Sequence, residues 1–208
     1  MTTERTGLTT TEPAWLWLVV LAALLISGMS PQADRYTWFL EALPVMIGLV
    51  LLAVTWQRFP LTLLSYRLLA IHAAILMIGA YYTYAEVPVF NLLRDSLELS
   101  RNHYDRVGHF VQGFVPAILC REILLRRSPL TPGRWLTFLT VCFCLAFSAL
   151  YELIEWWVAL MSEEAAEAFL GTQGDPWDTQ TDMFLALIGA LCALASLSRL
   201  HDRQLSHL

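Results

Sequence analysis

Long apolar runs alternate with short polar segments along the whole chain. Each run is about as long as the roughly 20 residues that a helix needs to cross a hydrocarbon core of about 30 Å. Charged residues gather between the runs, which is typical of membrane-spanning helices. The pattern predicts an all-α fold, a polytopic transmembrane bundle of about six helices, over residues 13–29, 37–56, 63–84, 104–125, 135–161 and 182–197.

Composition supports a lipid environment for this chain. Hydrophobic residues make up 57% of it and charged residues only 15%, which would leave a soluble domain with too much apolar surface. We expect one transmembrane domain over 13–200, a disordered cytoplasmic N-terminus over 1–12 and a cytoplasmic tail over 201–208. A signal peptide is the competing interpretation of the first run, but no small-residue cleavage site follows Ile26 and the preceding segment is not positive.

Arginine placement predicts the orientation of the bundle. All 13 basic residues are arginines, and an N-in/C-in topology puts nine of them on the cytoplasmic side and four on the other. The acidic segment 162–181 then lies outside. The net charge of −5 and the lack of a basic stripe argue against a nucleic-acid partner. Segment 88–102 is too polar to span, and its alternating leucines and charges predict a short interfacial helix.

Four cysteines, Cys120, Cys142, Cys144 and Cys192, lie within the apolar runs. A free thiol in such a run behaves as a small hydrophobe. We therefore expect packing residues and no disulfide framework.

Three polar stretches interrupt the membrane pattern, at 103–112, 148–155 and 171–182. In the predicted topology all three fall toward the outer leaflet. The spacing of Asp105, His109 and Gln112 places them on one face of the fourth helix. Ionisable side chains at this depth cost at least about 2.5 kcal/mol each when isolated, so they normally face the bundle interior and pair with one another or with a cation.

These side chains suggest a metal site. Imidazole nitrogens and carboxylate oxygens suit zinc, iron or manganese, and bundles build metal sites from ligands three or four residues apart on facing helices. We expect Glu152 and Asp178 to be catalytic and Asp105, Arg106 and Asp175 to complete the polar cluster. The expected metal ligands are His103, His109, Glu152, Glu155 and Asp182.

Structural roles remain open for each of these residues. Asp105 and Asp178 are also explained as acidic residues at positive helix N-termini. Glu152 and Glu155 are equally explained by buried ion pairs with Arg106 or Arg101. His109 could donate to a neighbouring carbonyl.

Four motifs in order carry a family resemblance: GAYYTY at 79–84, RNHYDRVGHF at 101–110, SALYELIEWW at 148–157 and FLGTQGDPWDTQTD at 169–182. Together they resemble the bacterial inner-membrane YjdF family, and the likeness covers nearly the whole chain. It implies a multi-pass protein of the bacterial inner (cytoplasmic) membrane with the same clustered polar residues. It implies no activity.

Three functions remain to be separated. The leading hypothesis is a metal-dependent hydrolase of a lipid-like ester, amide or phosphate, whose partners are membrane lipids. The second is cation or proton transport through the same carboxylates and histidines, which the apolar inner halves of helices four to six oppose, with His72 as the main polar exception. The third is a structural subunit that uses the polar cluster for packing.

Overall fold

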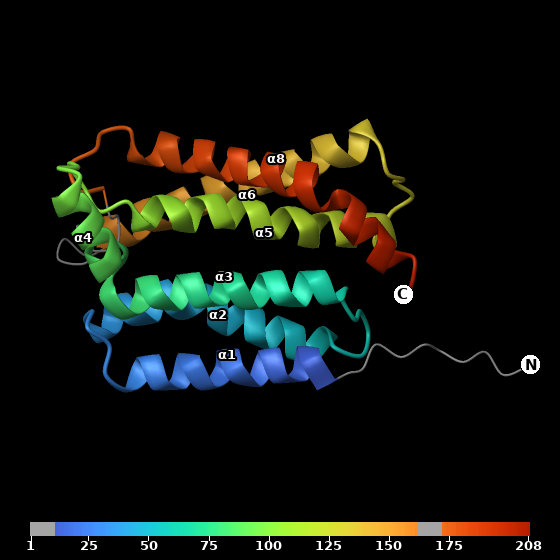
Figure 1. Cartoon of the computed structure of the whole chain (residues 1–208), viewed down its shortest axis with the longest axis horizontal. Helices are drawn as coiled ribbons and strands as arrows, with labels where there is room; N and C mark the ends of the chain where they lie inside the picture. The colour runs from blue at the N-terminus through green and yellow to red at the C-terminus, as the bar shows by residue number, and fades with distance from the viewer. Residues whose placement is uncertain (1–10, 162–171) are drawn as a thin grey trace, which may run out of the picture.

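The computed structural model describes residues 11–161 and 172–208, and every regular element in those ranges is a helix. The apolar runs become helices because a backbone in lipid must satisfy its own hydrogen bonds. The elements are α1 Thr11–Met29, α2 Arg35–Thr55, α3 Leu63–Tyr82, the 3-10 turn η1 Tyr84–Glu86, α4 Pro88–Ser96, α5 Tyr104–Arg127, α6 Arg134–Met161 and α8 Asp178–Leu205 (Figure 1).

Six of these helices are long and apolar enough to cross a membrane, which confirms the predicted all-α transmembrane bundle. Large apolar side chains such as Trp15 and Val54 remain exposed on the outside, at 66% and 63%. In lipid such exposure is favourable, because the bilayer core is as apolar as the protein interior. The N-in/C-in orientation stays a prediction.

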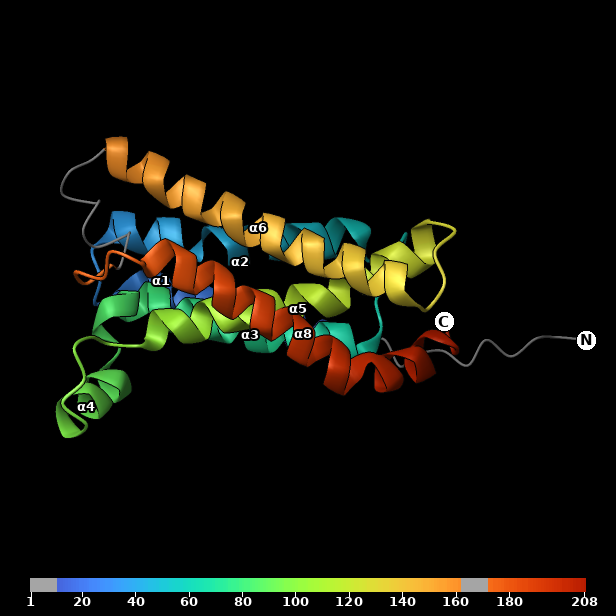
Figure 2. The same ribbon diagram turned by 90° about the horizontal axis from the view of Figure 1, so that it is seen from above.

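The helices form two layers (Figure 1). Helices α1, α2 and α3 make one layer, and α5, α6 and α8 make the other; α3 also contacts α5 and joins them. Helix α1 begins and α8 ends at the same end of the bundle, and α4 marks the opposite end (Figures 1 and 2). We call these the terminal end and the α4 end.

Polar side chains cap two helix starts. The Asp34 carboxylate accepts from the backbone N–H groups of Tyr36 and Thr37 at the start of α2, and the Thr62 hydroxyl accepts from Ser65 N–H at the start of α3. Such caps satisfy amides that a helix leaves unpaired. Hydrogen bonds from Thr37 and Tyr36 lower the pKa of Asp34, which lies outside the membrane-spanning segments.

Several boundaries differ from the expected ones. The short interfacial helix predicted over 88–102 is present as α4 but ends at Ser96, and its leucines are exposed. Helix α8 is longer than the expected 182–197 and continues to Leu205, so His201, expected in a tail, is fully buried in the bundle. Glu12 lies in the first turn of α1 and pairs with Arg67; residues 1–10 and 162–171 lie outside the described ranges.

All four cysteines are free, as expected. Cys120 and Cys144 are buried, and Cys144 belongs to the apolar core shared by α3, α5, α6 and α8. Cys142 and Cys192 are exposed on the outside of the bundle.

Candidate functional site

His109 on α5 lies between carboxylates from three helices. Its Nε2 is 3.4 Å from Asp105 Oδ1, on the preceding turn of α5, and 3.9 Å from Asp182 Oδ2 on α8. Its Nδ1 is 3.6 Å from Glu152 Oε1 on α6. The three stretches that the sequence separates by up to 77 residues, from Asp105 to Asp182, therefore meet around one imidazole. We call these four residues the His109 cluster.

Close packing of α5 on α8 brings His109 and Asp182 together. A Cβ atom added at Gly113, one turn after His109, would lie 1.8 Å from the carbonyl oxygen of Ala186, one turn after Asp182. A Cβ at Gly189 would lie 2.0 Å from the carbonyl oxygen of Phe110. Because only glycine permits this approach, the two glycines set the spacing on which the His109 cluster depends.

The His109 cluster is buried and incompletely hydrogen-bonded. His109, Glu152 and Asp182 are 5%, 8% and 2% exposed. His109 Nδ1, Glu152 Oε1 and Asp182 Oδ1 have no hydrogen-bond partner among the described residues, and neither has Gln112 Oε1 one turn further along α5. Buried polar atoms are nearly always paired, so a concentration of unpaired ones is typical of a site that binds a cation, water or ligand.

Part of the cluster approaches the dimensions of a metal site. Ligand atoms of Asp105, His109 and Asp182 all lie within 4.8 Å of one another. Two ligands of one zinc ion, each about 2.0–2.2 Å from it, can be at most about 4.4 Å apart. A small inward shift of the carboxylates would fit these three residues to one ion. One imidazole with two or three carboxylates suits manganese, iron or zinc.

Two arginines hold the α4 end of the cluster. Arg101, 3% exposed, pairs with Asp178 and lies 3.6 Å from Asp105 and 3.7 Å from Asp175. Arg106 pairs with Asp175 at 2.6 Å. The backbone N–H of Trp177, which donates to the carboxylate, and the two arginines lower the pKa of Asp175. These ion pairs join the start of α5 to the start of α8.

The cluster borders a large apolar cavity. The cavity measures about 590 Å³ and lies between the two layers, and Asp105 and His109 line it. Glu155, one turn beyond Glu152, also lines it, together with Tyr84 and Tyr151. A polar end joined to an apolar space is the general arrangement of small-molecule sites.

Comparison with known proteins gives the family. Residues 13–203 match the family described as "Predicted membrane protein (DUF2238)". The chain belongs to this family. It is also 51% identical over 188 residues to the "Inner membrane protein YjdF" of Escherichia coli (strain K12), and the match covers 90% of each chain. No solved structure matches.

These matches confirm the resemblance expected from the four motifs. This DUF2238 protein is a multi-pass protein of the bacterial inner membrane, like its relative. The family description supplies no activity.

In this DUF2238 protein, some of the expected site residues meet in one cluster and others lie outside it. His109, Glu152 and Asp182, with Asp105, form the cluster. Asp178 and Asp175 lie beside Arg101, and Arg106 pairs with Asp175. His103 is the residue before α5 and is not in the three-residue group that could hold a metal. Burial, with the nearby Arg106 and Arg101, lowers the pKa of His103.

Glu41 on α2 was missed by the sequence interpretation. It is 3% exposed, lines the cavity, and its Oε2 has no hydrogen-bond partner in the described part of the chain. The signal was present, because Glu41 is the one charged residue in the run 37–56. An ionisable residue within a span is a functional hypothesis by default.

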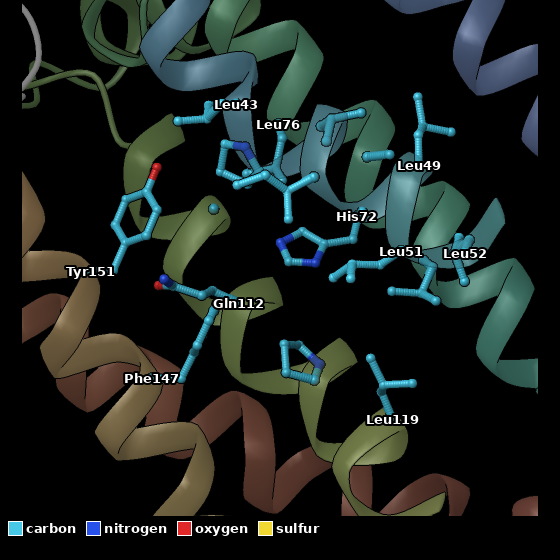
Figure 3. A pocket seen from close by; sticks show the side chains of 18 of the residues that line it. Leu43, Leu49, Leu51, Leu52, His72, Leu76, Gln112, Leu119, Phe147 and Tyr151 are labelled. Carbon is cyan, nitrogen blue, oxygen red and sulfur yellow. The ribbon is translucent and has the colours of Figure 1, made fainter. Parts of the chain in front are cut away.

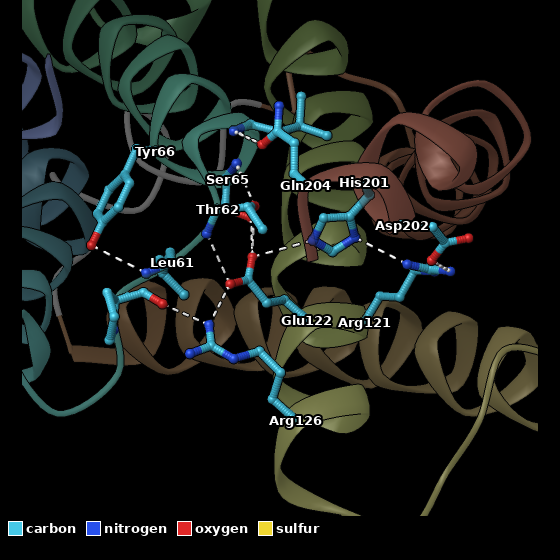
Figure 4. Close-up of polar contacts among 12 residues, drawn as sticks. Leu61, Thr62, Ser65, Tyr66, Arg121, Glu122, Arg126, His201, Asp202 and Gln204 are labelled. Atoms are coloured by element: carbon cyan, nitrogen blue, oxygen red, sulfur yellow. Dashed lines mark hydrogen bonds and ion pairs between the residues drawn. The ribbon is translucent and has the colours of Figure 1, made fainter. Parts of the chain in front are cut away.

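A second polar cluster at the terminal end was also missed (Figure 4). The Glu122 carboxylate is fully buried and accepts from Thr62 N–H and Oγ1, from Ser65 Oγ and from Arg126. His201 Nε2 lies 3.2 Å from it, and Arg121 contacts His201 Nδ1 at 3.1 Å. Both carboxylate oxygens are paired, so this cluster fastens α3, α5 and α8 together and leaves no free ligand atom on Glu122.

Proposed function

We propose that this protein is a metal-dependent hydrolase of a lipid-like substrate, with its reaction centre at the His109 cluster. The observation that carries the proposal is the set of buried atoms on His109, Glu152 and Asp182 that lack a partner within the described residues. Two of these residues, His109 and Asp182, belong with Asp105 to the one group of side chains in the described residues whose ligand atoms lie close enough to hold a metal ion after a small shift. The adjoining apolar cavity supports a substrate from the bilayer.

The chemistry follows from the ligand set. Asp105, His109 and Asp182 would hold a divalent metal, which would make a water acidic enough to attack an ester or phosphate. The water oxygen would bond to the carbonyl carbon or phosphorus, and the ester oxygen would leave with the bonding electron pair. Glu152, whose Oε1 is unpaired, would take the proton from water and return it to the leaving oxygen. Asp178 would hold Arg101 beside the reacting group.

Elemental analysis of the purified protein tests the proposal. We expect stoichiometric manganese, iron or zinc in the wild type, and at least about tenfold less in His109→Ala and Asp182→Asn, because even supporting residues of metal sites contribute that much affinity. Asp95→Asn is the matched control, since Asp95 is an exposed acid on α4 outside the cluster. A stable wild type that binds no metal would refute the metal site.

Turnover is then measured with bacterial phospholipid vesicles. We expect release of fatty acid or phosphate that requires the metal and stops in Glu152→Gln, while Glu152→Gln keeps much of its metal because three other ligands remain. Bound metal without turnover of any lipid class would refute the hydrolase and leave the metal site.

Proton transport is the second candidate, because α5 carries buried ionisable groups toward both ends, His109 and Glu122. Between them lies an apolar layer that includes Ala117 and Ile118, both fully buried. Such a layer opposes a continuous polar path. Proton flux into proteoliposomes that Glu152→Gln abolishes would favour transport over hydrolysis, and an absence of flux would remove it.

A further inference from the structure

The cavity between the layers is long as well as large. Helix α5 lines it from Asp105 to Ile123, which is about 27 Å of helix at 1.5 Å per residue. Helix α2 lines it from Leu40 to Leu52, about 18 Å, and Trp56 just after the helix also lines it. The length along α5 approaches the hydrocarbon thickness of about 30 Å. A volume of about 590 Å³ spread over such a length describes a narrow channel that suits one extended chain better than a compact ring system.

Most of the wall is apolar, and some of its few polar groups have buried atoms without a hydrogen-bond partner in the described part of the chain. Figure 3 shows leucines such as Leu43 and Leu76 around the space, with His72 from α3 and Gln112 from α5 reaching into it. His72 Nε2 and Gln112 Oε1 are buried without a hydrogen-bond partner among the described residues. Pro44 and Pro116 also line the cavity, and each removes the N–H that would pair the carbonyl four residues earlier.

The cavity reaches the lipid-facing surface along the seam between α2 and α6. These two helices belong to different layers and are not among the closely packed helix pairs of the described residues. Ile47 and Leu51 on α2 line the cavity and are 51% and 55% exposed; Phe147 and Leu150 on α6 are 40% and 47% exposed. A chain from the bilayer can therefore enter sideways without crossing a polar surface.

We propose that this cavity binds a single-chain amphiphile, a fatty-acyl or isoprenoid chain with one polar end. The apolar chain lies along α2 and α5, and the polar end lies beside the His109 cluster. Gln112, one turn after His109 on α5, and His72 on α3 contact polar atoms of the amphiphile next to its head group. The inference names the substrate class of the proposed hydrolase and rests on that function for its catalytic meaning, but the binding itself can be measured without turnover.

Gly48 offers a way to fill the cavity without disturbing the fold. It lines the cavity, and a Cβ atom added there would meet nothing within 4 Å. Gly48→Phe should therefore occupy the chain site while α2 keeps its packing. Ala53→Phe is the matched control, because Ala53 lies on the same helix, is exposed and does not line the cavity.

The probe is a diazirine analogue of palmitate, photo-crosslinked to the purified protein in nanodiscs, with labelled peptides located by mass spectrometry. We expect labels on cavity-lining segments of the wild type and Ala53→Phe, and at least about tenfold less in Gly48→Phe, a loss of about 1.4 kcal/mol or more in binding free energy. Competition with palmitate or with farnesol separates acyl from isoprenoid chains. Equal labelling in Gly48→Phe, or labels confined to outward residues such as Val54, would overturn the proposal.

Metal content is measured in the same samples, so the two proposals can fail separately. Labelling that Gly48→Phe blocks in a metal-free wild type keeps the chain site and removes the hydrolase. If the wild type binds metal and the probe labels Gly48→Phe as strongly as the wild type, the chain site is removed and the metal site of the proposed hydrolase is kept. Unchanged thermal stability of Gly48→Phe is the folding control for either result.

Discussion

Glu122 and His109 are both buried ionisable side chains of α5, and they differ in how completely their polar atoms are paired. The Glu122 carboxylate receives donors on both oxygens. An arginine side chain can only donate, so the contact from Arg121 makes His201 Nδ1 an acceptor and leaves Nε2–H to donate to Glu122. His109 has no comparable set of partners at Nδ1. Pairing therefore separates a structural cluster from a candidate site.

Replacing Glu122 tests the structural role. In Glu122→Gln, an NH2 group would replace one of the two oxygens that accept hydrogen bonds and would face groups that also donate. Arg126 would also lose its buried, negatively charged partner. Removing one partner of a buried pair costs about 3–5 kcal/mol, so we expect a marked drop in the melting temperature of the purified protein. Glu98→Gln, an exposed residue, should leave it unchanged. Metal content per folded chain should not change in either variant; loss of metal from a fully stable Glu122→Gln would mean that the two clusters have been assigned the wrong roles.

At the scale of elements, the pairing of α5 with α8 decides the geometry of the His109 cluster. Gly113 and Gly189 allow the two backbones to touch, and Asp182 and His109 lie on the same faces of their helices, within two turns of these contacts. The spacing Asp182, Ala186, Gly189 is the three-to-four residue period of one helix face. A site built across this contact depends on residues that bind nothing themselves.

Gly113→Ala tests that dependence. The added methyl would lie 1.8 Å from the Ala186 carbonyl oxygen, so α5 and α8 must move apart. Overpacking of this kind costs roughly 1–3 kcal/mol, and the distance from His109 to Asp182 should increase. We expect a lower melting temperature together with weaker metal binding. Gly48→Ala is the control: its methyl meets open space, and it should be neutral or stabilising by about 0.5–1 kcal/mol. Equal melting temperatures and equal metal binding in Gly113→Ala and Gly48→Ala would show that the close contact of α5 with α8 does not set the geometry of the His109 cluster.

At the scale of the whole molecule, hydropathy predicts the six spans because each helix satisfies its own backbone in lipid. Residue spacing also predicts the helix face that carries Asp105, His109 and Gln112. The sequence does not predict which helices pair, so it could not reveal the cavity between the layers or the contact of Glu122 with His201, 79 residues away. His103 was expected with the ligands because it precedes the same helix, but its position before the first turn of α5 leaves it outside the three-residue group.

Arginine placement predicts the orientation of the bundle, and the orientation decides which compartment the His109 cluster faces. Arg126, Arg127 and Arg134 flank the turn between α5 and α6, and short loops rich in arginine stay in the cytoplasm. We therefore expect alkaline phosphatase to be inactive when fused after Ser128 or after Leu208, and active when fused after Glu98 near α4. Green fluorescent protein should show the opposite pattern, fluorescing after Ser128 and Leu208. The reverse result would place the α4 end, and with it the candidate site, on the cytoplasmic side, where a hydrolase would act on inner-leaflet lipids.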